Sequence, residues 1–448
     1  MTDPSPEPAE LCELAVHLAR REEAEAEVTA WRGRSALTRF ANSHIHQNVA
    51  EDHAGVRVRV VAGGRLASAS SNRGDYEGVQ RLVEGALEAA CLRPLDPGWP
   101  GPAGGASAPA PGRYDAATHR APPQERAAVV SAFLGAAPDL GGAGFCSSGG
   151  QEVAFANTAG QRLVGRTSSA TVDAIHRSPT ADGMGWHAAT RLAELDGDRA
   201  GGVAAAKARA GSEPVDLEPG RYEVVLEPAC VDDMLYFLLD GFSAKTHGEG
   251  RSFVRLGEAQ FDAAVTLCDD ATHPAGNGLV FDAEGTPRRP LDLVVGGVSS
   301  ALVHDRRTAA RAGTQSTGHA VAGGESFGPM ALNPVLAPGA RAPGELVASM
   351  SRGLLVTDLW YTRTLDPKTS VVTGLTRNGT FLVEHGEVVA AVRNLRFTQS
   401  YADALAPGRV LGVGSDLRLR PSGALVPSLH LASWNFTGSV TSEAAGTD

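Results

Sequence analysis

The sequence lacks both the long apolar segments of a membrane protein and the excess of basic residues typical of nucleic-acid-binding proteins. Its 448 residues include 40 Lys and Arg against 51 Asp and Glu, so the formal net charge is −11 at pH 7. No apolar run approaches the roughly 20 residues that a membrane-spanning helix requires. An acidic chain without a dense Lys/Arg cluster is not expected to bind nucleic acid. We therefore expect neither a nucleic acid nor a membrane among its partners.

Cysteine is scarce and follows no recognisable pattern. The five cysteines are odd in number and widely spaced, which fits neither a disulfide framework nor a Cys-x-x-Cys metal site. They are Cys12, Cys91, Cys146, Cys230 and Cys268. Residues 1–7 are acidic and Pro-rich, without the basic and apolar stretches of a secretory signal. These features predict a cytoplasmic protein.

The first part of the chain combines helical and strand patterns. Leucines recur at helical spacing over residues 8–24, which predicts an amphipathic helix. Strand patterns follow at residues 27–31 and 38–42, and valines alternate with arginines over residues 56–60, as in a half-buried strand. Residues 1–93 are therefore predicted to form an N-terminal α/β domain.

A change in composition separates this part from the next. Residues 94–123 are rich in Pro, Gly and Ala and are predicted to form a linker or a long surface loop. Strand patterns then occur at residues 151–157 and 165–175, and an Ala-rich helix is expected at residues 200–210. Residues 124–215 are predicted as a middle α/β region that packs with the N-terminal domain.

From residue 220 onward, short apolar runs alternate with Gly, Asp, Asn and Pro. Such spacing, which includes a run at residues 279–282, is typical of many short strands joined by turns. A single helix, over residues 228–241, is expected to interrupt them. Residues 220–448 are therefore predicted as a mostly-β domain. The predicted fold class is α+β, with an N-terminal α/β layered domain followed by a barrel-like or sandwich-like C-terminal domain.

The histidines do not form the usual motif of a zinc hydrolase. Such an enzyme needs His or carboxylate ligands, an open coordination position and a carboxylate base, often with Glu directly after the first His of a helix. None of the 13 histidines is followed by Glu. His247 and His385 come nearest, because each is followed by Gly and then Glu.

Seven short motifs follow one another along the chain. In order, they are Thr38-Arg39-Phe40-Ala41-Asn42, Asn157-Thr158-Ala159-Gly160, Arg251-Ser252-Phe253, Cys268-Asp269-Asp270, Phe281-Asp282-Ala283-Glu284-Gly285, Ser316-Thr317-Gly318-His319 and Gly353-Leu354-Leu355-Val356-Thr357-Asp358. Taken together in this order, they resemble the TldD/PmbA family of zinc metallopeptidases. The resemblance covers most of the chain.

The resemblance implies where zinc ligands would be found. Catalytic TldD-type members carry His-Glu-x-x-x-His on the helix before the Ser-Phe motif, and a Cys ligand in a late Cys-Gly turn. The corresponding helix here, residues 231–241, contains no His, Glu or Cys, and the late turn at residues 412–415 contains no Cys. Both ligand sources are absent, so the pattern is closest to the TldE (PmbA) branch. It predicts no metal, no cofactor and no catalytic residue in this chain.

For that branch, the resemblance implies a subunit that pairs with a TldD-like zinc-binding subunit. The two would form a heterodimer or higher heteromer, with zinc in the partner. The complex would be a metallopeptidase that cleaves unstructured peptides or small peptide-like substrates. This chain would form part of the wall of the substrate chamber, where a peptide could add as a strand to an exposed sheet edge.

Four residues are candidates for a vestigial site: Asp233, Asp240, His247 and Glu249. Two alternatives remain open. The chain could be a hydrolase active on its own through an atypical site among these residues, in which case the isolated protein should contain zinc. It could also be a scaffold or binding protein in peptide natural-product maturation. A neighbouring gene that encodes the full His-Glu-x-x-x-His motif would favour the subunit hypothesis over both.

Three histidines offer a competing metal site. His44 and His46 share one face of a predicted strand and could bind a metal with His53. They could equally be exposed or hydrogen-bonded strand residues. No serine has the glycine elbow or the His and Asp spacing of a hydrolase triad.

Two further clusters also have competing explanations. Asp269-Asp270 and Asp282 with Glu284 could bind a divalent cation through oxygens, although turn chemistry explains them more simply. The glycine-rich run at residues 314–328 could hold an anion such as a substrate carboxylate. It would do so with three upstream arginines, Arg306, Arg307 and Arg311.

Overall fold

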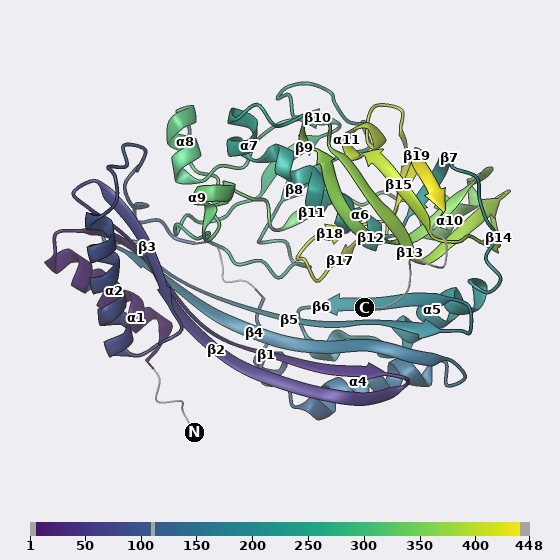
Figure 1. Ribbon diagram of the computed structural model, residues 1–448, viewed down its shortest axis with the longest axis horizontal. Helices are drawn as coiled ribbons and strands as arrows, with labels where there is room; N and C mark the ends of the chain where they lie inside the picture. The colour runs from purple at the N-terminus through teal and green to yellow at the C-terminus, as the bar shows by residue number, and fades with distance from the viewer. Residues whose placement is uncertain (1–5, 109–112, 440–448) are drawn as a thin grey trace.

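The computed structural model describes residues 6–108 and 113–439 and has a mixed α+β fold. A long, curved antiparallel sheet forms the N-terminal half, and a β-rich C-terminal region lies over its concave face (Figure 1). The predicted fold class, an α/β layer followed by a barrel-containing β region, is confirmed. No helix in the described ranges is long and apolar enough to cross a membrane.

The first sheet has six strands in the order β3-β2-β1-β4-β5-β6, with every neighbouring pair antiparallel. Its strands are β1 (Glu25–Ala41), β2 (His44–Ala62), β3 (Arg65–Ser71), β4 (Gly141–Asn157), β5 (Arg162–Arg177) and β6 (Asp182–Ala189). The sheet draws three strands from each of the two predicted units, residues 1–93 and 124–215. Their boundaries as separate domains stay a prediction.

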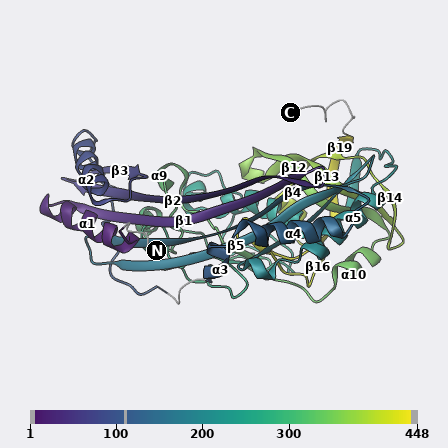
Figure 2. The ribbon, with the colours of Figure 1, turned by 90° about the horizontal axis from the view of Figure 1, so that it is seen from below.

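Helices cover the convex face of this sheet, turned away from the C-terminal region (Figure 2). One pair packs at each end: α1 (Pro8–Arg21) with α2 (Tyr76–Cys91), and α4 (Pro123–Gly135) with α5 (Gly197–Ala210). Apolar residues that alternate along β1 and β2 pack under α1 and α2. Local sequence signals start these helices, since the Asp75 side chain caps α2 and a proline opens both α1 and α4.

Five strands of the C-terminal region close into a barrel. Their order is β12-β7-β19-β15-β13, and pairing of β12 with β13 completes the ring. The barrel strands are β7 (Gly220–Leu226), β12 (Arg352–Asp366), β13 (Val371–Glu384), β15 (Leu395–Ser400) and β19 (Leu429–Ser439), with β14 (Glu387–Ala391) and β16 (Val410–Val413) attached. The apolar face of α6 (Pro228–Leu238) is buried in the same core as the barrel strands.

A second C-terminal sheet of short strands lies beside the barrel. Its order is β10 (Val298–Ser299), β9 (Leu291–Val295), β8 (Leu267–Asp269), β11 (Pro334–Leu336), β18 (Leu425–Val426) and β17 (Arg418–Leu419). The remaining short helices are α3 (Ala116–His119), α7 (Ala244–Gly248), α8 (Arg306–Ala312), α9 (Gly324–Phe327), α10 (Pro343–Ala348) and α11 (Tyr401–Ala404). Three 3₁₀ turns complete the set: η1 (Leu192–Glu194), η2 (Leu239–Phe242) and η3 (Pro367–Thr369).

Several local predictions were wrong. The two strand patterns at residues 27–31 and 38–42 belong to one long strand, β1. Residues 279–282 form no strand, because they lie over the central strands of the first sheet and bury Val280 and Phe281 against side chains of β4 and β5. The C-terminal region contains five short helices besides α6 in its described part.

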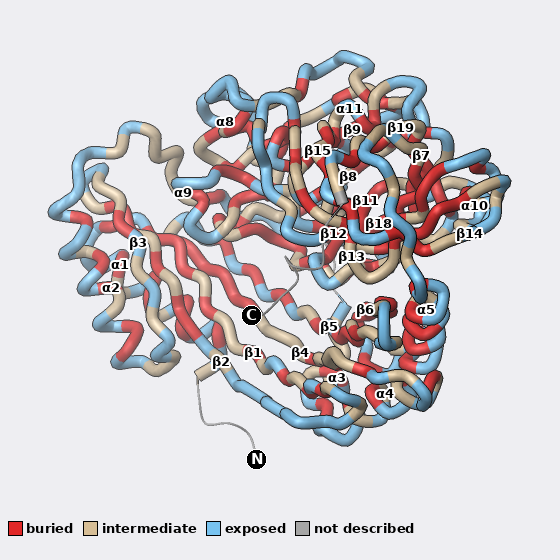
Figure 3. The backbone as a smooth tube through the Cα atoms, turned by 45° about the vertical axis from the view of Figure 1, so that its right-hand side comes forward, coloured by how far each residue is buried: buried red, intermediate tan, exposed pale blue. Residues whose placement is uncertain are grey.

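The described parts of the predicted linker, residues 94–108 and 113–123, pack closely against their neighbours, and residues 109–112 lie outside the described residues. They contain α3, and their backbone carbonyls at Ala103 and Ala106 accept hydrogen bonds from the side chains of Asn157 and Gln161. The backbone is buried where the helices or the C-terminal region cover the sheet, whereas the first half of β2 is exposed (Figure 3).

Candidate functional site

Two adjoining cavities lie where the concave face of the first sheet meets the C-terminal region. One, of about 600 Å³, is lined from the sheet by Trp31 and Arg57 and from the opposite side by Phe281 and Arg288. A neighbouring cavity of about 490 Å³ shares Arg59 with it, and a third of about 540 Å³ beside α6 shares residues of two loops with it. The three therefore adjoin one another along one cleft.

Strand periodicity decides which side chains face this cleft. Along β1, Val28 and Ala30 point to the helices and are fully buried, whereas Glu27 and Trp31 line the cleft. Along β2 the arginines alternate with the buried valines in the same way. A period of two thus places apolar residues under the helices and charged residues on the opposite face.

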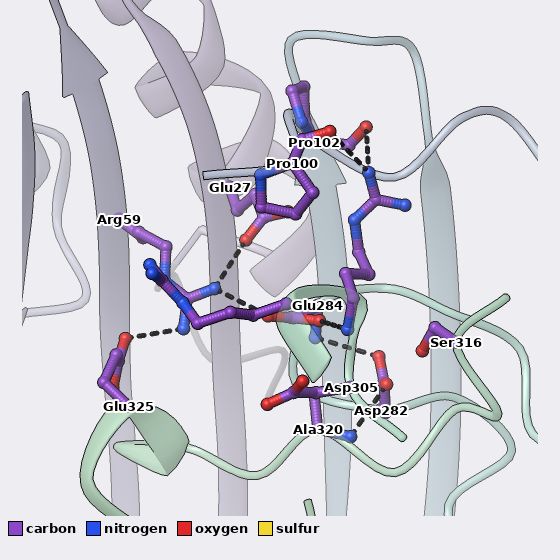
Figure 4. Close-up of polar contacts among 12 residues, drawn as sticks. Glu27, Arg59, Pro100, Pro102, Asp282, Glu284, Asp305, Ser316, Ala320 and Glu325 are labelled. Carbon is purple, nitrogen blue, oxygen red and sulfur yellow. Dashed lines mark hydrogen bonds and ion pairs between the residues drawn. The ribbon is translucent and has the colours of Figure 1, made fainter. Parts of the chain in front are cut away.

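Arg59 is the centre of a buried charge cluster (Figure 4). Its guanidinium lies 3.1 Å from a carboxylate oxygen of Glu27 on the neighbouring strand and 3.1 Å from one of Glu284 in the C-terminal region. A third carboxylate, Glu325 in α9, lies 2.6 Å away and is more exposed. The Arg59 guanidinium therefore pairs with two well-buried carboxylates and connects the sheet to two C-terminal segments.

The pKa of Glu27 is raised well above its ordinary value. Burial is the main cause and raises it to about 8, which the attraction of Arg59 only partly offsets. Repulsion from Glu284 acts in the same direction as burial. The Arg59 guanidinium stays charged, because the surrounding carboxylates raise its pKa despite burial. At neutral pH Glu27 is therefore mostly protonated.

The carboxylates of Asp282 and Glu284 accept hydrogen bonds from backbone N–H groups of nearby loops. Both carboxylate oxygens of Asp282 accept backbone N–H groups, from Glu284 and Thr286 at one oxygen and from Ala320 at the other. Burial, followed by repulsion from Glu284, raises the pKa of Asp282 to about 6. Glu284 also accepts the backbone N–H of Arg306. These are turn and capping contacts that leave few free oxygens for a cation.

The motif residues Asp269 and His319 meet in the interior. The Nε2 of His319 lies 3.1 Å from Oδ1 of Asp269, and its Nδ1 lies 2.8 Å from the hydroxyl of Thr317. Burial opposes ionisation of Asp269, but His319 and Arg288 outweigh it and hold the pKa of that carboxyl below its usual value. Both His319 and Asp269 are almost completely buried, so this pair is closed to solvent. We interpret the pair as a structural contact inside the core.

The helix that would carry zinc ligands is α6, and its acidic residues have other partners. Asp233 accepts hydrogen bonds from the hydroxyls of Thr362 at 2.7 Å and Tyr401 at 3.1 Å. Burial raises the pKa of Asp233 to about 6, partly offset by these two bonds. Asp232 accepts from Arg420 and Ser422. The two carboxylates thus connect α6 to β12, to α11 and to the turn between β17 and β18.

The other three vestigial-site candidates do not converge with Asp233. Asp240, His247 and Glu249 are exposed. Glu249 forms ion pairs with Arg251 at 2.6 Å and Lys245 at 3.0 Å, which lower its pKa. The structure places these residues on the surface at and after η2, so they form no common catalytic group.

The described residues provide no donor set that fits zinc. Across residues 6–108 and 113–439, no group of three His, Cys, Asp or Glu side chains is placed to hold a metal ion. His44 and His46 lie exposed on β2, and His53 packs against Gly33 on the neighbouring strand. No step of a reaction can therefore be assigned to a metal bound by these residues.

The predicted anion site is also occupied by internal contacts. The Arg306 guanidinium donates to the carbonyls of Gly101 and Pro102, and Arg307 pairs with Asp96 at 2.5 Å. The glycine-rich run lies beside them, but these two cations already have partners. Only Arg311, which is exposed, is left of the three.

Several residues of the cleft were missed in the sequence. The alternation along β1 could have placed Glu27 and Trp31 on one face, because the same pattern identified the buried valines of β2. No local signal distinguishes Arg59 or Arg288 from other arginines. Their importance comes from contacts with residues more than 40 positions away in sequence.

Two family models match this chain. One, described as the PmbA/TldA metallopeptidase C-terminal domain, matches residues 219–438, and the other, described as PmbA/TldA metallopeptidase domain 1, matches residues 26–90. The chain belongs to the PmbA/TldD metallopeptidase family. The family members are hydrolases of the metallopeptidase class.

Curated relatives match parts of the chain. A metalloprotease from Methanothermobacter thermautotrophicus is 27% identical over 210 residues, which is 45% of this chain and 44% of that protein. An uncharacterized protein from Methanocaldococcus jannaschii is 36% identical over 108 residues, 23% of this chain and 26% of that protein. The matched segments span less than half the length of these relatives.

Solved structures show the same fold over nearly the whole chain. The crystal structure of TldE from Thermococcus kodakarensis has a TM-score of 0.87 and 20% identity, and the match covers 96% of this chain and 100% of that one. A proposed modulator of DNA gyrase from Thermotoga maritima has a TM-score of 0.81 and 20% identity, covering 96% and 99%. At this identity, the likeness shows the fold alone.

Proposed function

We propose that this chain is the non-catalytic, TldE-like subunit of a heteromeric zinc metallopeptidase in the cytoplasm. A TldD-like partner would hold the zinc and carry out the hydrolysis of unstructured peptides or small peptide-like substrates. The observation that carries the proposal is the absence of zinc ligands from the helical segment of residues 231–241, which spans most of α6 and part of η2. This segment contains no His, Cys or Glu, and Asp232 and Asp233 accept hydrogen bonds from Arg420 and Thr362.

An apolar surface beside α6 supports a partner at this position. The cavity of about 540 Å³ is lined by Tyr236, Met330 and Leu332, whose exposed fractions are 69%, 40% and 39%. Phe327 in α9 is 70% exposed. Clusters of large exposed apolar side chains in a soluble protein mark interaction sites. We place the partner's active face over this surface.

The free edge of the first sheet supports peptide binding. In the described structure β3 pairs only with the second half of β2, from Val56 onward, so residues 44–54 of β2 have no neighbour on that side. All side chains from His44 to Asp52 are exposed. An extended peptide can add to such an edge through backbone hydrogen bonds, whatever its side chains.

Co-expression tests the proposal. The chain is purified alone and together with a TldD-like protein encoded in the same genome, and zinc content and cleavage of an unstructured peptide are measured. We expect no zinc and no cleavage for the chain alone, and zinc with cleavage for the co-purified complex. Replacing the Glu of the partner's motif should abolish cleavage and leave the complex intact.

A pair of tyrosine variants tests the interface. Tyr236→Asp should prevent co-purification with the partner, because it puts a charge into the apolar surface. Tyr76→Asp is the matched control, since Tyr76 is 55% exposed on α2, far from that surface. Stoichiometric zinc or peptide turnover by the isolated chain would reject the subunit function and favour a hydrolase active on its own.

A further inference from the structure

Arg288 is a buried cation with too few partners. Its side chain is only 6% exposed, yet the guanidinium makes a single hydrogen bond, from Nη1 to Oδ1 of Asn333 at 3.0 Å. Its Nε is buried without any partner among the described residues. A guanidinium has five N–H donors, and leaving a buried charge unpaired is costly. The site therefore has unused capacity for an anion.

The nearest carboxylates cannot supply that anion. The charge of Arg288 favours the ionised form of both Asp282 and Asp269. Burial nevertheless raises the pKa of Asp282 overall, whereas the pKa of Asp269 stays below its usual value. Neither carboxylate forms an ion pair with Arg288, because Asp282 accepts three backbone N–H groups and Asp269 contacts His319 and the N–H of Asn333. Their oxygens are committed elsewhere, so the donors of Arg288 remain available.

Arg288 lines the cavity of about 600 Å³ in front of the first sheet. That volume lies within the range of small-molecule sites, roughly 300–1,000 Å³. The apolar part of its wall includes Trp31, Leu279 and Phe281. Arg57 adds a second cation without an ion pair in the described structure, whereas Arg59 is already surrounded by three carboxylates. The cavity thus combines an apolar wall with unpaired positive charge.

We propose that this cavity binds a small ligand with a free carboxylate and an apolar group, of the class of a short peptide with a free C-terminus. Arg288 pairs with the carboxylate, and Trp31 and Phe281 contact the apolar side chain. Arg is suited to this role because its planar fork binds a carboxylate through two parallel hydrogen bonds. The peptide class rests on the proposed function, whereas the need for a carboxylate rests on Arg288 alone.

Calorimetric titration of the isolated chain tests the proposal without partner or zinc. The probes are the dipeptide leucyl-phenylalanine and its C-terminal amide. We expect the free acid to bind at least about tenfold more tightly than the amide, because only the acid offers a carboxylate. Equal affinities, or no binding of the acid up to about 5 mM, would overturn the proposal.

Two variants at one position separate binding from folding. Arg288→Met should abolish binding of the acid while the variant still unfolds cooperatively on heating, with a midpoint below that of the wild type because the buried Asp269 loses a nearby cation. Arg288→Lys keeps the charge without the fork and should weaken binding several-fold. Arg311→Met, on the exposed end of α8 and outside this cavity, should bind like the wild type.

The outcomes remain distinct from those of the co-expression experiment. If a folded Arg288→Met variant still binds the acid as tightly as the wild type does, Arg288 is a packing residue and the binding site is refuted. This result does not bear on whether a zinc subunit is recruited through α6. Conversely, failure to recruit a partner would reject the subunit function while leaving the carboxylate site supported by acid-specific binding.

Discussion

Replacing Glu27 by Gln should make the protein more stable than the wild type at alkaline pH. Glu27 is 4% exposed and shares Arg59 with Glu284, and its pKa is raised from an ordinary 4.5 to about 8. The native protein therefore binds a proton that the unfolded chain releases. The stability from this proton is fully present below pH 4.5 and is lost as pH rises through 8.

The size of the effect follows from the pKa difference. Each pH unit between the unfolded and native pKa values costs the wild type about 1.4 kcal/mol. Between pH 5 and pH 8 the sum is roughly 3 kcal/mol. Gln mimics the protonated carboxyl and does not titrate. The difference in unfolding free energy between Glu27→Gln and wild type should therefore move by roughly 3 kcal/mol in favour of Gln over this range.

Urea titrations at pH 5, 6, 7 and 8, followed by tryptophan fluorescence, measure this difference. Glu51→Gln is the matched control, because Glu51 lies exposed on β2 and its substitution should give a difference that is constant with pH. A constant difference for Glu27→Gln, or one that turns against Gln as pH rises, would refute the reasoning. Either result would mean that Arg59 outweighs burial and keeps Glu27 ionised.

Three further predictions concern the fold. Asp233→Ala should lower the unfolding free energy by about 1–3 kcal/mol, because it leaves the buried hydroxyl of Tyr401 and the half-buried hydroxyl of Thr362 without their acceptor. Asp240→Ala, at an exposed position, should change it by less than about 0.5 kcal/mol in the same urea assay. Gly285→Ala should lower the unfolding free energy by about 2–5 kcal/mol, since its Cβ would lie 2.2 Å from the ring of Phe155 at a φ of +71°. Gly257→Ala has a similar φ but open space around it, and should cost only about 1–2 kcal/mol in thermal unfolding. Native protein should show one thiol that reacts quickly with DTNB, Cys91, because the other four are buried or half-buried with raised pKa values, and Cys91→Ser should remove that phase.

Local patterns in the sequence predicted much of the secondary structure. The alternation of valines with arginines identified β2, and it holds because a strand places successive side chains on opposite faces. Leucines at helical spacing predicted the helix over residues 8–24, which the structure shows as α1. The order of short motifs pointed to the family that the comparisons confirmed. These features depend on neighbours in the chain.

Local patterns failed where the chain turns back on itself. The apolar run at residues 279–282 has the composition of a strand, but it forms a turn whose side chains pack on the first sheet. The long strand β1 was divided in two because its polar middle has no apolar alternation, although pairing with both neighbours keeps it continuous. Tertiary pairing overrides local preference in such segments.

The candidate site likewise combines features that the sequence reveals with features that only the folded structure reveals. By itself, the sequence determined that residues 231–241 contain no imidazole or thiolate ligand and that residues 56–60 of β2 have a polar and an apolar face. Only the tertiary structure decided that Arg59 meets Glu284, 225 positions away, and that Arg288 is buried without a carboxylate partner. The physical reason is that charge and burial depend on which distant segments share a volume. A local pattern determines the face on which a side chain lies, and folding determines what it meets there.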